Sequence, residues 1–132
     1  MSKTVYFVGM HNKPGKLPLD SNTKTGKIID EIISGIKSNC VKTNLCEVEY
    51  HQIELVNQAE IDVKAKEWHY KYKPKDEDVI VLLGNWVKEN FEWNFGKKLK
   101  NTVELFHPAS FKVRGNKSQY VSDAIKLINN LL

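Results

Sequence analysis

Residues 5–26 read V-Y-F-V-G-M-H-N-K-P-G-K-L-P-L-D-S-N-T-K-T-G. The four apolar residues at 5–8 predict a buried strand, and Gly9 predicts its end. A polar loop punctuated by glycine and proline follows, and it leads into an isoleucine-rich segment that begins at Gly26. In an open α/β sheet, ligands bind beyond the carboxyl ends of the strands. The loop at 9–25 is therefore a candidate binding site, although its composition names no ligand.

The rest of the chain alternates between strand-like and helix-like segments. Five isoleucines between positions 28 and 36 fall on one face of a helix predicted over 26–38. The continuous apolar run at 78–83, closed by Gly84, is typical of a strand covered on both faces. Further strands are predicted at 4–9, 41–45 and 102–106, and further helices at 58–70, 86–95 and 117–131, with a loop around Pro74.

Four strands that alternate with helices predict a single α/β domain over residues 1–132. We expect a three-layer α/β/α fold with a four-stranded parallel sheet and right-handed crossovers. A chain of this length can bury a substantial core. The carboxyl ends of the strands would bring four loops to one edge of the sheet, at 9–25, 44–50, 84–86 and 107–116.

Composition and charge exclude few functional classes. Hydrophobic residues make up 41% of the chain and charged residues 27%, which is ordinary for a soluble globular domain. No apolar run approaches the ~20 residues that span a bilayer, and the first residues lack the apolar core of a signal peptide. We therefore expect a cytoplasmic protein, and a monomer. The net charge of +4 is compatible with a polyanionic partner but does not require one.

The two cysteines, Cys40 and Cys46, flank a predicted strand. Two thiolates are too few for a four-thiolate iron–sulfur or zinc site without help from histidine, and no C-x-x-C pair is present. His51 and His69 stand at no ligand spacing with each other or with the cysteines, and we expect both at the surface. The sequence thus predicts buried free thiols, no metal and no cofactor.

Polar side chains follow three of the four predicted strands. The first loop carries His11 and Asn12, the second carries Asn44, and the fourth carries His107 before Pro108. An asparagine amide can pair bidentately with a base edge, and a histidine N–H can stabilise an oxygen that gains negative charge. Taken singly, each has an ordinary alternative, because asparagine often forms turns and a His-Pro pair often only shapes a loop.

In this order, the motifs resemble those of the uracil-DNA glycosylase superfamily, most closely its single-strand-selective monofunctional and mismatch-type branch. The resemblance covers most of the chain. The G-M-N-P-G-like first motif corresponds to G-M-H-N-K-P-G at 9–15, the V-x-N-L-C strand to V-K-T-N-L-C at 41–46, and the H-P-S-P-like motif to H-P-A-S at 107–110. The run at 79–84 and the segments 18–19 and 25–26 also match the family's pattern.

The resemblance implies a hydrolase that extrudes a nucleotide from the base stack and cleaves the N-glycosidic bond of uracil or a related damaged base. Asn44 would pair with the N3–H and O4 edge of uracil. His107 would hydrogen-bond O2 and stabilise the departing anion, helped by backbone amides near Met10 and His11. Leu19 stands where the family has an aromatic residue that stacks on the base.

The resemblance also implies which residues hold the water and the DNA. Either His11 or Asn12 occupies the position of the family's asparagine, and we favour Asn12, which stands nearer the Pro-Gly pair, as the residue that positions the attacking water. The expected partner is DNA, either single-stranded or with a base flipped from a duplex. The residues expected to contact it are Lys13, Lys16, Phe111, Lys112 and Arg114, with Phe111 and Arg114 filling the gap left by the flipped base.

Two other functions stay open. Leu19, Ala109 in place of a serine, and the short chain favour a member that binds nucleic acid, a nucleotide or a free base without cleavage. An enzyme acting on nucleosides, similar to deoxyribosyltransferases, would need a carboxylate nucleophile. Asp20 is the one acid in the first loop, and it serves more simply in a turn or cap.

Aromatic residues also allow two interpretations. Trp68, Tyr70 and Tyr72 alternate with lysines, as in a stacking platform for single-stranded nucleic acid. Packing of these aromatic residues on the sheet is the expected alternative. The remaining group, expected in the core, is Trp86, Phe91, Trp93 and Phe95.

Overall fold

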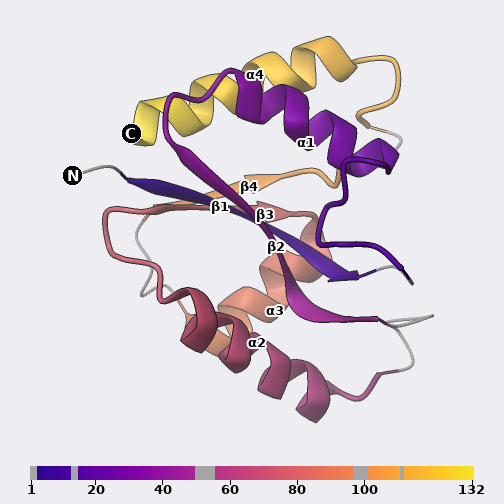
Figure 1. The fold of residues 1–132 in the computed structure, drawn as a ribbon, viewed down its shortest axis with the longest axis vertical. Helices are drawn as coiled ribbons and strands as arrows, with labels where there is room; N and C mark the ends of the chain where they lie inside the picture. The colour runs from indigo at the N-terminus through magenta and orange to yellow at the C-terminus, as the bar shows by residue number, and fades with distance from the viewer. Residues whose placement is uncertain (1–2, 13–14, 50–55, 97–100, 111) are drawn as a thin grey trace.

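The computed structural model describes residues 3–12, 15–49, 56–96, 101–110 and 112–132 (Figure 1). All the strand pairs are parallel, and the sheet order is β2-β1-β3-β4. This confirms the predicted three-layer α/β/α fold with a four-stranded parallel sheet. The elements in chain order are β1 (Thr4–Asn12), α1 (Lys24–Ser34), β2 (Asn39–Glu49), α2 (Gln58–Tyr72), β3 (Val79–Leu83), α3 (Asn85–Phe95), β4 (Thr102–Leu105) and α4 (Lys117–Leu131).

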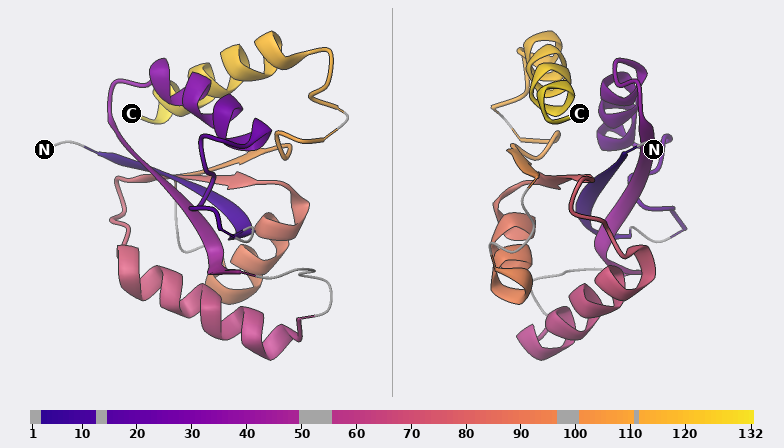
Figure 2. Two further views of the ribbon diagram at one scale, coloured as in Figure 1. Left: turned by 45° about the vertical axis from the view of Figure 1, so that its right-hand side comes forward. Right: turned by 90° about the vertical axis from the view of Figure 1, so that its left-hand side faces the viewer.

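Helices cover both faces of the sheet, with α1 and α4 on one side and α2 and α3 on the other (Figure 2). Every residue of β3 is buried, as the continuous apolar run predicts. In β1, successive side chains point to opposite faces, so that Val5 and Phe7 join the α1/α4 core while Tyr6 and Val8 join the α2/α3 core. The two cores fix the register of β1, because a slip of one residue would exchange them.

Helix α1 is shorter at its carboxyl end than the predicted 26–38. It begins after Thr23, whose hydroxyl accepts a hydrogen bond from the Gly26 N–H at 3.0 Å. It ends at Gly35, where a side chain would lie 2.5 Å from Cδ1 of Ile125 on α4. The Gly35 carbonyl accepts a hydrogen bond from the Asn129 side chain. Gly35 thus allows α4 to approach closely at the residue where α1 stops, and the isoleucine periodicity contains no sign of this contact.

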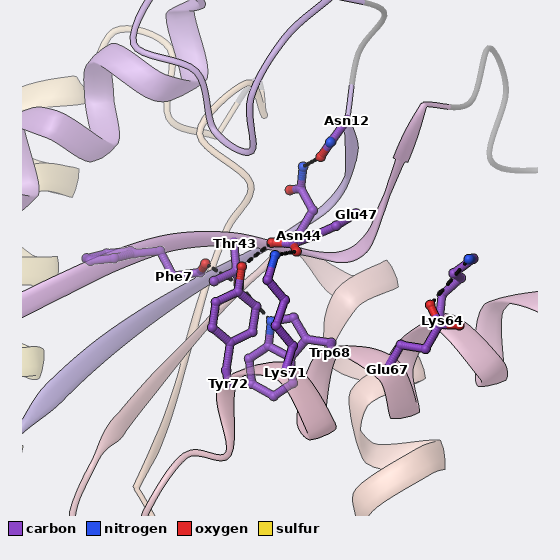
Figure 3. A network of polar contacts seen from close by, with 10 residues as sticks. All are labelled: Phe7, Asn12, Thr43, Asn44, Glu47, Lys64, Glu67, Trp68, Lys71 and Tyr72. Atoms are coloured by element: carbon purple, nitrogen blue, oxygen red, sulfur yellow. Dashed lines mark hydrogen bonds and ion pairs between the residues drawn. The ribbon is translucent and has the colours of Figure 1, made fainter.

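A buried chain of hydrogen bonds connects α2 to the two strands beneath it. The indole N–H of Trp68 donates to the Thr43 hydroxyl at 2.8 Å, and that hydroxyl donates to the Phe7 carbonyl at 2.9 Å (Figure 3). Trp68 is 2% exposed, so the packing interpretation holds for this residue. Tyr72 is half-buried and its hydroxyl bonds to Glu47, and burial followed by that contact raises the pKa of Tyr72 to about 12. Tyr70 is exposed.

One aromatic residue departs from the expected core. Trp93 is 73% exposed, although Phe91 on the same helix is buried. The buried positions of α3 are Val87, Asn90 and Phe91, which share one face at helical spacing. Trp93 lies in the last turn of α3, beside this face, and is exposed, whereas Trp86 at nearly the same helical phase packs against the α2/α3 core. Hydrophobicity suggested burial for both residues, and only Trp86 is partly covered by its neighbours.

The structure also shows the state of both cysteines and the exposure of one of the two histidines expected at the surface. Both cysteines are free thiols, Cys46 buried and Cys40 only partly so. Burial raises the pKa of the Cys46 thiol to about 11. His69 is exposed as expected, whereas His51 lies outside the described residues.

Within the described part of the chain, no helix combines the length and apolarity needed to cross a bilayer.

Candidate functional site

Strand β1 does not end at Gly9, contrary to the prediction. It continues through Asn12, because β2 goes on pairing with it: Gly9 lies opposite Asn44 and His11 opposite Cys46. The register shifts between His11 and Asn12. His11 and Asn12 are therefore held on a paired strand rather than in the loop, which gives them more definite positions than the sequence suggests.

The absence of a side chain at Gly9 allows the side chains of Asn44 and Leu19 to pack close to the backbone of β1. A Cβ at this position would stand 2.4 Å from Oδ1 of Asn44 and 2.9 Å from Cδ2 of Leu19. Both distances are too short for a real contact, so glycine is the residue that leaves room for them. Asn44 is only 3% exposed, and its side chain is packed across β1 at this point.

A hydrogen bond joins the two asparagines that the sequence singled out. Nδ2 of Asn44 donates to Oδ1 of Asn12 at 2.7 Å (Figure 3). The nitrogen of the Asn44 amide thus faces Asn12, whereas its oxygen lies over Gly9. Asn44 lines the cavity described below, and Asn12 is hydrogen-bonded to Asn44 without lining the cavity itself.

His107 lies directly after β4 in a turn that determines its tautomer. The Ala109 N–H donates to Nδ1 of His107 at 3.1 Å. A neutral imidazole that accepts at Nδ1 carries its proton on Nε2, so His107 presents an N–H donor from that atom. Gly84, at the end of β3, has a φ of +95°, and a Cβ there would stand 3.3 Å from Cβ of His107. The backbone after β3 therefore lies against the histidine.

His11 shows the opposite arrangement. Its Nδ1 is 3.0 Å from the carbonyl oxygen of Asn12. A carbonyl oxygen only accepts, so Nδ1 carries the proton and Nε2 of the neutral ring is in its acceptor form. The hydrogen bonds at Nδ1 thus favour opposite tautomers of the two neutral rings, with the proton on Nε2 in His107 and on Nδ1 in His11.

The first loop is built around the Asp20 carboxylate. It accepts hydrogen bonds from the backbone N–H groups of Asn22, at 2.9 Å, and Leu17, at 3.1 Å. These two bonds, that from Asn22 first, lower the pKa of the Asp20 carboxyl. Asp20 therefore acts in a turn, as the simpler alternative predicts. Its backbone carbonyl lies so close to α1 that a Cβ on Gly26 would be 1.9 Å from it.

These segments enclose a cavity of about 140 Å³ at the carboxyl edge of the sheet. Its volume is below the ~300–1,000 Å³ of typical ligand pockets, so it suits a single ring rather than a whole nucleotide. The predicted site residues that line it are Met10, His11, Lys16, Leu19, Asn44 and His107.

Leu17 also lines the cavity and was missed by the sequence interpretation. It is 75% exposed, which is unusual for leucine. The available signal was an apolar residue between Lys16 and Pro18 in an otherwise polar loop.

The residues expected to contact DNA lie farther apart than the residues expected to contact the base. Lys16 lies at the cavity, whereas Lys112 and Arg114 are exposed in the turn before α4, outside the cavity lining. Nζ of Lys112 lies 4.7 Å from the centre of the Phe106 ring. The expected contacts from Lys13 and Phe111 fall outside the described residues.

Among the described residues, no cluster of three or more histidine, cysteine, aspartate or glutamate side chains could hold a metal ion. Comparison with known proteins finds no matching family model, no matching curated protein and no matching solved structure. The interpretation of the cavity therefore depends on its own geometry and on the motifs that line it.

Proposed function

We propose that the protein is a hydrolase of the uracil-DNA glycosylase type, which cleaves the N-glycosidic bond of uracil or a related base in DNA. The observation that supports this most is the convergence of Asn44, His107 and the end of β1 on one ring-sized cavity. These groups come from three strands that are far apart in the sequence. They are the groups that the resemblance assigns to the base.

The amide of Asn44 matches the edge of uracil. It offers an acceptor at Oδ1 and a donor at Nδ2, which carries a second hydrogen beyond the one given to Asn12. Uracil presents a donor at N3 and an acceptor at O4, and cytosine presents the reverse pattern. The amide therefore favours uracil as long as its orientation is maintained.

His107 supplies the stabilisation of the leaving group. When the C1′–N1 bond breaks, its electron pair leaves with the base, and negative charge develops on O2 of uracil. The Nε2–H of His107 donates to that oxygen, and Nδ1 is kept in its acceptor form by the Ala109 N–H. A positioned donor of this kind is worth roughly 100- to 1,000-fold in rate.

The attacking water is assigned to His11. Of the two residues that the resemblance leaves open, His11 lines the cavity, whereas the side-chain oxygen of Asn12 accepts from Asn44. Nε2 of His11 accepts a hydrogen bond from the water, whose oxygen then bonds to C1′ of the sugar. The proton released by the water balances the negative charge on the departing base. The products are free uracil and an abasic sugar.

Because the cavity is small, we expect the sugar and phosphates of the substrate to lie at the surface. A volume of about 140 Å³ accommodates the base, so the sugar and phosphates would lie at the mouth. Lys16 and Leu17 stand there, and Lys16 supplies positive charge for a phosphate. A nucleotide extruded from a strand would present its base and backbone in this way.

The test is uracil release from a single-stranded oligonucleotide that contains one deoxyuridine. Wild type should release uracil, and Asn44→Ala and His11→Ala should each reduce the rate at least tenfold. Asn101→Ala is a matched control, because Asn101 lies at the opposite edge of the sheet, before β4. If wild type releases no base from uracil or damaged-base substrates that a known glycosylase processes, the hydrolase proposal is wrong.

A second candidate is a protein that binds a base or nucleic acid without cleaving it. The hydrogen bond between Asn12 and Asn44 favours it, because it engages the asparagine that the resemblance would use to position water. Leu19, in the place of an aromatic residue, favours it as well. Salt-sensitive oligonucleotide binding that yields no abasic product would support this function over hydrolysis.

A further inference from the structure

We propose that Asn12 sets the base specificity of the cavity by fixing the orientation of the Asn44 amide. This inference rests on the proposed function, in which the cavity binds a pyrimidine base. An asparagine amide rotated by half a turn exchanges its oxygen and nitrogen with little change in shape. Because uracil and cytosine present opposite patterns of donor and acceptor, that rotation would change which base Asn44 accepts.

The nitrogen end of the amide is held by Asn12. Nδ2 of Asn44 lies 2.7 Å from Oδ1 of Asn12, so an acceptor faces the nitrogen. If the Asn44 amide rotated while Asn12 kept its orientation, two oxygens would face each other, and the hydrogen bond would become a repulsion. Asn44 is 3% exposed, so bulk water cannot readily replace the lost partner.

The oxygen end of the amide lies over Gly9. Oδ1 of Asn44 is 2.4 Å from the point where a Cβ of residue 9 would stand. Gly9 and Asn44 both line the cavity, so this end of the amide belongs to its wall. Gly9 leaves room for the amide at this position, and the hydrogen bond with Asn12 distinguishes its nitrogen from its oxygen (Figure 3).

A break in the regular pairing of β1 with β2 accompanies the contact between Asn12 and Asn44. Val5 and Phe7 point to the α1/α4 face, and strand alternation places Gly9 and His11 on that face as well. From the pair His11/Cys46 to the pair Asn12/Glu49, β1 advances by one residue and β2 by three, so the extra residues lie in β2. Regular pairing ends at this point, and the side chain of Asn12 reaches Asn44. Irregularities of this kind commonly re-aim a side chain next to a functional site.

Two substitutions at position 12 distinguish a role in orienting the Asn44 amide from a role in positioning water or in stabilising the strand. Asn12→Asp keeps an acceptor towards Asn44 and cannot donate, so it should preserve the preference for uracil. Asn12→Ala removes the acceptor, so the amide can rotate and cytosine can bind. A residue that only positioned water would change the rate of turnover and leave the ratio of the two binding constants as it was. A residue that only stabilised the strand would weaken both bases alike.

The measurement is the equilibrium binding of free uracil and free cytosine to the full chain by calorimetry. Wild type should prefer uracil by roughly 10- to 100-fold, the discrimination expected of a two-point amide contact with a base. Asn12→Asp should keep this ratio, and Asn12→Ala should bring it to within about threefold of unity. Asn101→Ala, at the other edge of the sheet, should match wild type.

The outcomes distinguish this inference from the proposed function. If wild type prefers uracil and Asn12→Ala keeps the same preference, the role of Asn12 is wrong and base binding stands. If Asn12→Asp prefers cytosine, Asn12 donates to Asn44 instead, and the inference is overturned even if Asn12→Ala fails to fold. If wild type binds neither base, the proposed function fails and the inference fails with it.

Discussion

The side-chain oxygen of Asn44 lies over the α-carbon of Gly9, at a point where a methyl group would be only 2.4 Å away. The two residues are also register partners in the pairing of β1 with β2. The pair thus joins the backbone of one strand to the side chain of the next at the wall of the cavity. The absence of a side chain at position 9 is what allows Asn44 its orientation.

Gly9→Ala should therefore displace both Asn44 and Leu19. We expect a loss of about 1–3 kcal/mol in the free energy of unfolding, as for other overpacked sites. Uracil binding should fall as well, because the amide moves. Urea unfolding and calorimetry measure the two effects. An Asn44 side-chain amide signal that is unchanged in the NMR spectrum of the variant would contradict the contact.

Two glycines, Gly26 in the first turn of α1 and Gly35 at its C-cap, offer a matched comparison. Gly26→Ala would place Cβ 1.9 Å from the backbone carbonyl of Asp20, which can yield only if the loop moves. Gly35→Ala would meet the flexible end of Ile125 at 2.5 Å, which can change rotamer. Gly26→Ala should cost at least about 2 kcal/mol more than Gly35→Ala in urea unfolding. Equal costs would show that the loop yields as easily as a side chain.

Thr43→Val tests the buried hydrogen bonds beneath α2. The substitution keeps the shape but leaves the Trp68 N–H and the Phe7 carbonyl without their partner. Each unsatisfied buried group costs about 1–3 kcal/mol, so a loss of roughly 2–4 kcal/mol is expected. Thr102→Val on β4 is the control, because Thr102 is exposed. A Thr43→Val variant as stable as this control would argue against the network.

Asp20 should make the first loop sensitive to acid. Its pKa is lowered in the folded protein, so its stabilising contribution is present above the carboxyl's ordinary pKa and disappears as the pH falls through the lowered one. Wild type should be more stable than Asp20→Asn at pH 7, and the difference should shrink as the pH falls below the ordinary pKa of a carboxyl group. Urea unfolding across this range measures it. Asp76→Asn, in the exposed turn before β3, should show a smaller difference.

His107→Ala should lower uracil release by roughly 100- to 1,000-fold, because it removes the donor to the leaving base. His69→Ala is the histidine control, since His69 is exposed on α2. Single-turnover assays on a deoxyuridine oligonucleotide separate this effect from product release. A His107→Ala rate within threefold of wild type would remove this residue from the proposed mechanism.

The layers of the fold follow closely from sequence patterns. The run at 79–83 is buried on both sides of the sheet, and its uniform apolarity already indicates this. The ends of elements were harder to predict. Gly9 looks like a strand terminator, but β2 continues to pair beyond it, and pairing with a distant strand is invisible to a local pattern. At Gly35, where α1 ends, α4 approaches closely, and this neighbour is equally remote in sequence.

The site shows the same division. The sequence predicts that Asn44 and His107 lie at one edge of the sheet, and both line the cavity. Asn44, however, lies within β2, which continues to Glu49, and not in a loop that begins at residue 44 as predicted. The hydrogen bond between Asn12 and Asn44 forms where the register of β1 against β2 shifts, and no residue type indicates that shift. Trp93 illustrates the converse error, because residue type suggested burial for a side chain that is 73% exposed.

The strand order has a mechanical consequence for the cavity. Asn44 belongs to β2 and His107 follows β4, and these are the two outermost strands of the sheet. A base bound by both residues would connect the two edge strands of the sheet, β2 and β4, across the central strands β1 and β3. Since such a ligand binds only when all four strands are assembled, its occupancy would report the docking of β4, the last strand in the chain.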